Sequence, residues 1–292
     1  MLLDNVVQPD VLSLFSSTSS HPLLLASALT VPPTPSNESF IALLPDSCSP
    51  DCDGGETLLA WAGQDGGLEE RVASLRAVRA NAQAGEGETP LKDVRGRVLH
   101  LQAPDCRTTS VRWGWMPSSS SSWKEEGLGV ELDRLHLQIK DMGQACYVDV
   151  AVLSEDGEVV VVRASTWQSA PNLHPATPSR PRLLHLPLLF PSSSSSSTPL
   201  LTRWTTLTLP LSTLFSSVPP SSSSTASHPP RFKAVLGVEV HATCRLRRVW
   251  FSSPGAGADG MGERGTGEAM DEVDEEMVRR GIRPELALFA AG

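Results

Sequence analysis

Hydrophobic and polar residues alternate with a period of two in the most regular parts of this chain. Residues 135–140 place Leu, Leu and Ile at every second position, and residues 148–152 do the same with three valines. This spacing is typical of strands with one buried face. The sequence Ser-Glu-Asp-Gly-Glu at 154–158 predicts a turn, and the valines at 159–162 begin a return strand. These segments together predict a β-hairpin.

Other short segments show the same strand-like pattern, and few show helical spacing. Strands are predicted at 97–103, 108–115, 129–132, 183–188, 204–211, 234–243 and 245–252. About nine short strands without an alternating strand–helix rhythm predict an all-β antiparallel sandwich or jelly roll. Helical spacing of apolar residues occurs at 68–82 and at 268–280.

Stretches rich in Ser, Pro and Gly separate the predicted strands. Loop closure entropy rises only slowly with loop length, so a folded domain tolerates such stretches as insertions. We therefore expect one β-sandwich domain over residues 1–292 rather than two domains joined by a linker. The insertions expected to be disordered are 30–56, 117–125, 191–199, 216–230 and 254–268.

Charge is distributed unevenly along a chain whose net charge is -9. Residues 231–250 hold five basic residues and one acid, whereas residues 259–285 hold nine acidic and four basic residues. A basic surface on an acidic chain suits an acidic protein partner better than nucleic acid, for which overall positive charge is expected. The apolar run at 23–29 is too short to span a bilayer, so no membrane association is expected. Five dispersed cysteines indicate a reduced intracellular protein.

One segment near the C-terminus resembles a known family. Residues 238–252 read V-E-V-H-A-T-C-R-L-R-R-V-W-F-S, and residues 163–169 read R-A-S-T-W-Q-S. Both are similar to signatures of the cilia- and flagella-associated protein 20 family. Shorter stretches resemble the family's opening, one internal strand and its close. These lie at 11–15, 128–132 and 284–289.

The resemblance carries expectations about fold and function. It implies a β-sandwich similar to carbohydrate-binding modules and a structural role at the inner junction between the A- and B-tubules of ciliary doublet microtubules. The expected partners are tubulin and neighbouring junction proteins, in the axoneme, the basal body or the centriole, with no cofactor and no small-molecule substrate. In a cell without cilia, a centriolar or nuclear scaffold role is expected instead.

Basic residues of the 231–250 segment are the candidate contacts with tubulin or junction proteins. Guanidinium groups bind carboxylates in bidentate fashion, which suits the acidic surface of tubulin. Pairing of these arginines with Asp149 or Glu239 within the sheet is an equally open alternative. The candidates are Arg231, Lys233, Arg245, Arg247 and Arg248.

The arginine-rich strand conflicts with strict alternation. If alternation held from 244 to 252, Arg245 and Arg247 would share a face with Val249 and Phe251, and neither face would be apolar. A β-bulge, or a face that is only partly covered, would resolve the conflict.

No set of residues points to catalysis. His241 and Cys244 fall on opposite faces of the predicted strands, and His241 is expected to be packed or hydrogen-bonded within the sheet. Cys48 and Cys52 have no second ligand pair at zinc-finger spacing. The G-x-G-x-x-G at 255–260 lacks the βαβ unit that dinucleotide binding requires. We therefore expect no metal site and no enzymatic activity.

Tryptophans supply the alternative function, a lectin-like carbohydrate-binding module. Trp113 and Trp115 alternate onto one predicted face, where exposed indoles would form a platform for sugar rings. Burial in the core is the competing interpretation for both residues, and it is the one we favour for Trp204 and Trp250.

Overall fold

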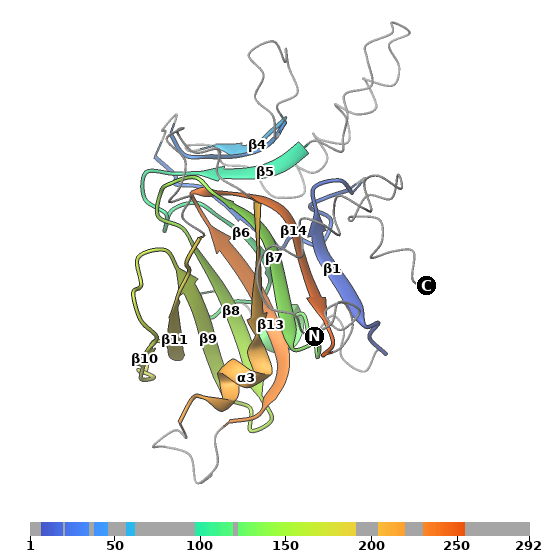
Figure 1. Cartoon of the computed structure of the whole chain (residues 1–292), viewed down its shortest axis with the longest axis vertical. Coiled ribbons are helices and arrows are strands. Elements are labelled where there is room, and N and C mark those ends of the chain that lie inside the picture. Colours follow the sequence, from blue (N-terminus) through green and yellow to red (C-terminus); the bar gives the residue numbers. More distant parts are fainter. Residues whose placement is uncertain are drawn as a thin grey trace, which may run out of the picture.

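Two β-sheets packed face to face make up most of the part of the molecule that the structure describes (Figure 1). The structure is a computed structural model, and it describes residues 7–19, 21–34, 38–45, 57–61, 97–118, 122–190, 204–219 and 230–254. Each sheet contains seven strands, and the apolar side chains of both meet between them. The all-β sandwich predicted from the periodicity is confirmed.

Sheet A carries the arginine-rich strand near its centre. Its strand order is β12 (Trp204–Pro210), β7 (Arg134–Asp141), β14 (Cys244–Ser252), β5 (Arg97–Gln102), β3 (Phe40–Pro45) and β4 (Thr57–Trp61). A further strand, β1 (Val11–Ser16), pairs with β14. Figure 1 shows β1 alongside β14, with β4 and β5 at the end of the molecule farthest from α3.

Sheet B forms the opposite layer. Its order is β10 (Asn172–His174), β11 (Arg182–Pro187), β9 (Val159–Ser165), β8 (Tyr147–Ser154), β13 (Phe232–His241), β6 (Ser110–Gly114) and β2 (Ala28–Thr30). Strands β8 and β9 form the predicted hairpin, and Gly157 in its turn has a φ of 83°. All pairings in sheet B are antiparallel except that of β9 with β11.

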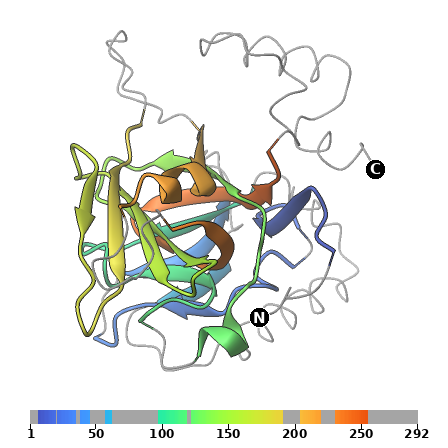
Figure 2. The same ribbon diagram turned by 90° about the horizontal axis from the view of Figure 1, so that it is seen from below.

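Two short helices accompany the sheets within the described residues. Helix α2 (Trp123–Glu126) begins at Ser122, whose side chain accepts a hydrogen bond from the Lys124 amide. Helix α3 (Leu211–Ser216) follows β12 and lies at one end of the sandwich (Figure 2). None of the described helices has the length and apolar character that a membrane crossing needs.

The core matches the period-two pattern of the sequence. The apolar residues of 135–139 on β7 and of 148–152 on β8 have no exposed surface, while the residues between them on β7 are half-buried. One face of each strand therefore packs inward, and the other faces outward. The outer face of sheet A is consequently the surface on which the polar residues of β7 and β14 gather.

Parts of the predicted insertions are ordered. Strand β3 lies inside the predicted insertion 30–56, and its Ile41 is fully buried between β4 and β5. Residues 123–125 of helix α2 lie inside 117–125, and Val218, within 216–230, is 1% exposed. For these residues the structure differs from the expectation of disorder, because the apolar side chains of β3 and Val218 reach the core, and α2 is a capped helix without buried residues. Within the predicted insertions, the segments 35–37, 46–56, 119–121, 191–199, 220–229 and 255–268 lie outside the described residues.

Three further expectations have definite outcomes. Residues 129–132 form no strand, and only an isolated bridge joins Val130 to Val235. Trp113 is fully buried in the core, whereas Trp115 packs in a separate cluster with Met116. The prediction that Trp113 and Trp115 share a face is wrong, because Gly114 between them adopts a φ of 73° and ends the alternation. The predicted helices at 68–82 and 268–280 lie outside the described residues.

Candidate functional site

A β-bulge resolves the alternation conflict in β14. Leu246 lies opposite Ile139 of β7 and Arg248 lies opposite the next residue, Gln138, so Arg247 is an additional residue in the strand. Leu246 and Val249 are both fully buried although two residues lie between them. The bulge therefore lets two consecutive arginines occupy the interval between two inward-facing residues. The bulge interpretation is confirmed.

The bulge brings several cations together on the outer face of sheet A. Arg245 lies opposite Lys140 of β7, and Lys140 lies opposite Trp204 of β12. The Arg247 guanidinium carbon lies 4.6 Å from the centroid of the Trp204 ring, and the Lys140 Nζ lies 5.9 Å from it. We call Lys140, Arg245, Arg247 and Arg248 the cationic strip.

Exposure differs along the cationic strip. Arg248 is 8% exposed, whereas Lys140, Arg245 and Arg247 are half-buried. Among the described residues of β7, β12 and β14, no Asp or Glu takes an outward-facing position. Lysine and arginine therefore supply the charge that the described residues of these three strands place on that face.

A stacked aromatic pair lies next to the cationic strip. The rings of His136 and Trp250 are 5.0 Å apart and nearly parallel. The His136 nitrogens lie 3.0 Å from the Thr208 hydroxyl and 2.9 Å from the Ser252 hydroxyl. Burial, and then the charge of Arg134, lower the pKa of His136, so its ring is neutral at neutral pH. The positive charge beside it comes from lysine and arginine.

The tryptophans of this face correct one expectation. Trp204 and Trp250 are half-buried on the outer face of sheet A, and the core does not contain them. Trp204 lies in the same cross-strand row as Lys140, and Trp250 lies opposite His136. Their indole faces are therefore available to hold cations and an imidazole rather than to fill the space between the sheets.

Arg231 and Lys233 are separate from the cationic strip. Both are exposed at the start of β13 in sheet B, where the register with β8 shifts between Phe232 and Ala234. The structure thus groups three of the five predicted binding residues and places these two elsewhere.

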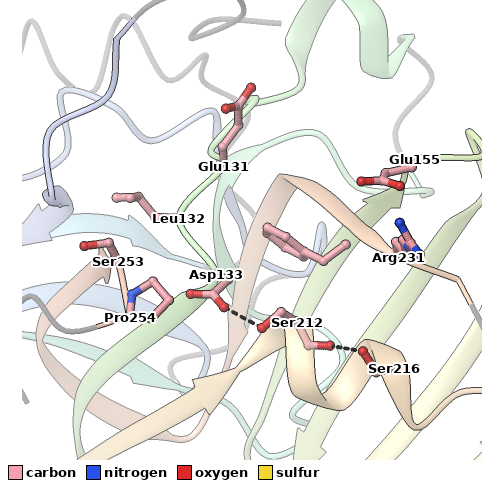
Figure 3. A pocket seen from close by; sticks show the side chains of 10 residues that line it. Glu131, Leu132, Asp133, Glu155, Ser212, Ser216, Arg231, Ser253 and Pro254 are labelled. Carbon is pink, nitrogen blue, oxygen red and sulfur yellow. Dashed lines mark hydrogen bonds between the residues drawn. The ribbon is translucent and has the colours of Figure 1, made fainter.

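Arg231 lines a shallow cavity of about 480 Å³ at one end of the sandwich (Figure 3). Three carboxylates, those of Glu131, Asp133 and Glu155, share this cavity, and Asp133 accepts a hydrogen bond from the Ser212 hydroxyl. The Glu155 amide donates to the Arg231 carbonyl oxygen at 3.0 Å. The surroundings of Arg231 are acidic, unlike those of the β14 arginines.

The alternative role of the arginines, pairing with Asp149 or Glu239, is wrong. Both acids lie on sheet B, in the other layer of the sandwich. Asp149 accepts two hydrogen bonds of 2.7 Å from Arg163, and Glu239 accepts one of 2.7 Å from Ser110. The arginines of β14 therefore do not serve these two carboxylates.

Sheet B holds a polar and aromatic network that the sequence analysis missed. The rings of Tyr147 and His241 stack at 3.9 Å, and the Arg163 guanidinium lies 4.5 Å from the Tyr147 ring centroid. Trp167, which is 48% exposed, meets Tyr147 edge to face. The register of the predicted hairpin already implied that residue 149 lies opposite residue 163, so the sequence did contain a signal for this pair. Because its ion pairs are satisfied internally, we interpret the network as a stabilising feature of sheet B.

His241 and the thiols of Cys146 and Cys244 are packed within the sandwich, whereas Cys48, Cys52 and residues 255–260 lie outside the described residues. Burial raises the pKa of the Cys146 thiol to about 12 and raises that of Cys244 well above its ordinary value, so both thiols are protonated. His241 is packed against Tyr147, as expected for a strand residue. Among the described residues, no three His, Cys, Asp or Glu side chains gather as metal ligands would.

A family model for the CFA20 domain matches residues 75–255, which extend from before β5 to just after β14. The chain belongs to the CFA20 domain family. The family is that of cilia- and flagella-associated protein 20, and the role of this CFA20 domain is accordingly associated with cilia or flagella. A comparison with curated proteins found no match.

The matched residues contain both the bulged strand of this CFA20 domain and the segment 163–169. They also contain all four members of the cationic strip. The resemblances at 11–15 and 284–289 lie outside the matched residues.

Proposed function

We propose that this CFA20 domain is a non-catalytic scaffold that binds microtubules in the cilium or flagellum. It bridges tubulin and neighbouring proteins at the inner junction of doublet microtubules, in the axoneme or the basal body, and contributes to cilium assembly and motility. Membership of the family supports the ciliary setting, and the outer face of sheet A supports the mode of binding.

The cationic strip is the observation that carries the proposal. Tubulin presents an acidic surface, and guanidinium groups pair with carboxylates through two parallel hydrogen bonds. The bulge places Arg247 next to Arg248 in the strand, and the Trp204 ring holds the Arg247 guanidinium at 4.6 Å. A side chain held in this way loses less conformational entropy on binding than a free one.

The lectin-like alternative loses its candidate platform. Trp113 is fully buried in the core and donates no surface to a ligand. Trp115 packs beside Met116 in the cluster on the other side of sheet B. We therefore propose no carbohydrate-binding function for these residues.

Co-sedimentation of the full chain with stabilised microtubules tests the proposal. Arg245→Glu combined with Arg247→Glu reverses two charges of the cationic strip and should weaken binding by roughly tenfold or more. Binding of the unchanged protein should also fall as ionic strength rises, because the Debye length is only about 8 Å at 0.15 M salt.

Arg231→Glu combined with Lys233→Glu is the matched control. It makes the same change in net charge at exposed positions of sheet B. This control should co-sediment like the unchanged protein apart from a small general charge effect. Equal loss of binding in both double variants would show that net charge, and not the cationic strip, governs association.

A further inference from the structure

Strand β12 is an edge of sheet A. It pairs with β7 along its whole length, from Trp204 opposite Lys140 to Pro210 opposite Arg134, without a register shift. In the part of the chain that the structure describes, no strand pairs with its other side. An edge of this kind presents backbone donors and acceptors to any segment that can lie alongside it.

The hydrogen-bond pattern shows which residues of β12 face the open side. The Leu211 amide donates to the Asp133 carbonyl oxygen at 2.7 Å, directly continuing the β12–β7 register. Hydrogen-bonded and non-hydrogen-bonded pairs alternate in an antiparallel ladder. Leu209 and Leu207 therefore bond toward β7, while the backbone groups of Thr208 and Thr206 point to the open edge.

Two further features agree with this assignment. Thr206 and Thr208 are both exposed. The backbone of Pro210 faces the open edge, like those of Thr206 and Thr208. Its lack of an amide proton therefore costs no hydrogen bond to β7.

The composition of β12 favours strand addition. Its sequence, Trp-Thr-Thr-Leu-Thr-Leu-Pro, has high β propensity and contains no charged residue. Edges that must stay unpaired are usually protected by lysines, inward-pointing charges or bulges. Apart from the terminal Pro210, β12 has none of these devices.

The two faces of β12 define the side chains that an added strand should carry. On the inner side, Leu207 is half-buried and packs against the rim of the core, so an apolar side chain beside it would extend that core. On the outer side, Lys140 and Arg247 flank Trp204 at the start of the strand, which favours a carboxylate. We propose that β12 binds an extended segment of a neighbouring protein, with alternating apolar and acidic side chains, as an additional strand of sheet A.

Charge also argues against a second copy of this chain as the occupant. A two-fold antiparallel pairing of β12 with itself centred on Leu207 would place Trp204 of one copy opposite Pro210 of the other. Lys140 and Arg134 are the β7 residues behind those two positions, so like charges would approach each other at both ends. An acidic strand meets no such repulsion.

A defined peptide tests the proposal on the full chain. The probe is a fluorescent, end-capped seven-residue peptide of alternating Glu and Val, and its binding is followed by fluorescence anisotropy. Thr208→Pro removes the outward amide proton without removing a bond to β7, and it should weaken binding by roughly tenfold. Thr208→Val loses the same hydroxyl but keeps the amide, so it should bind the probe like the unchanged protein.

Two companion measurements keep the test decisive if Thr208→Pro folds poorly. A probe N-methylated on the edge that faces β12 should not bind the unchanged protein, and a Lys–Val probe should bind more weakly than the Glu–Val probe. Equal binding of the methylated probe, or of Thr208→Pro, would overturn the proposal. A concentration-dependent dimer abolished by Thr208→Pro would identify a second copy as the occupant and would overturn it as well.

Strand addition is separable from microtubule binding. Thr208→Pro leaves every residue of the cationic strip in place, so it should still co-sediment with microtubules. Conversely, the Arg231→Glu and Lys233→Glu control should bind the peptide normally.

Discussion

The Arg247 guanidinium lies over the ring of Trp204, with its carbon 4.6 Å from the centroid of the indole. The two residues come from β14 and β12, which are separated in the sheet by β7. The contact therefore spans three strands on one face and helps to orient the Arg247 side chain. Its strength is of the order of 0.5–1 kcal/mol for a partly exposed pair.

Replacement of Trp204 should reduce microtubule binding without removing any charge. Trp204→Ala removes the aromatic ring that helps to orient Arg247 and Lys140, so we expect a loss of roughly threefold to fivefold in affinity in the co-sedimentation assay. Trp204→Phe retains an aromatic face and should keep most of the affinity. Identical behaviour of the two variants would show that the ring does not orient the arginine.

Gly114→Ala should destabilise the fold severely. A Cβ at Gly114 would meet the Leu236 carbonyl oxygen inside contact distance and lie 2.5 Å from the Leu128 Cγ, at a φ of 73°. We expect a loss of about 3 kcal/mol or more in the free energy of unfolding, measured by denaturant titration.

Gly143→Ala is the matched control for that substitution. Gly143 has a φ of 71° but nothing within 4 Å of the added Cβ. It should cost only about 1 kcal/mol, the price of the backbone conformation. A similar loss in both variants would mean that backbone conformation alone, and not the close approach at Gly114, sets the effect.

The Asp149–Arg163 pair should behave as a stabilising element of sheet B. Asp149→Asn removes the charged partner of Arg163, whose side chain is only 28% exposed. We expect a loss of about 2 kcal/mol in the free energy of unfolding. Adding Arg163→Met should recover part of it, because the unpaired charge is then gone. Microtubule binding should not change, since the pair lies in the other sheet.

Stability should fall as the pH is lowered from 7 to 5. Burial and then the charge of Arg134 lower the pKa of His136, and burial, Arg163 and His174 lower that of His185. At pH values between the ordinary histidine pKa of about 6.5 and the lowered pKa values, the unfolded chain therefore binds more protons than the folded chain. Stability is full above the unfolded value and declines as the pH falls through this window.

Thermal unfolding at a series of pH values measures this effect. The melting temperature should drop between pH 7 and pH 5, and His136→Gln should make the drop smaller because glutamine does not titrate. An unchanged pH profile in His136→Gln would show that His136 contributes nothing to the linkage.

The sequence predicted most of the fold because period-two alternation reports directly on burial. The β8–β9 hairpin and the strand over 134–141 follow from valine, leucine and isoleucine at every second position. The alternation fails as a guide where the backbone departs from extended geometry. Gly114 separates Trp113 from Trp115, and a period-two count cannot foresee a positive φ.

The candidate site was predictable only in part. The arginines of β14 were visible as a charged segment, and their conflict with alternation pointed to a bulge. The role of Trp204 depends on the pairing of β12 with β7. These two strands are more than 60 positions apart in the sequence, and composition does not reveal that they pair. Arg231 and Lys233 belong to the same charged segment of the sequence, but they lie at sheet B rather than at sheet A. Strands β13 and β14 are consecutive yet belong to different sheets, so proximity in sequence does not imply a common surface.

The bulge in β14 also separates what the core requires from what the surface displays. With a single residue between Leu246 and Val249, the strand would alternate without interruption and still direct both side chains inward. Packing between the sheets therefore does not require the second arginine. A chain lacking one residue at this point would keep the same interior and lose one positive charge, so the number of arginines presented here is adjustable by single-residue insertion or deletion independently of the fold.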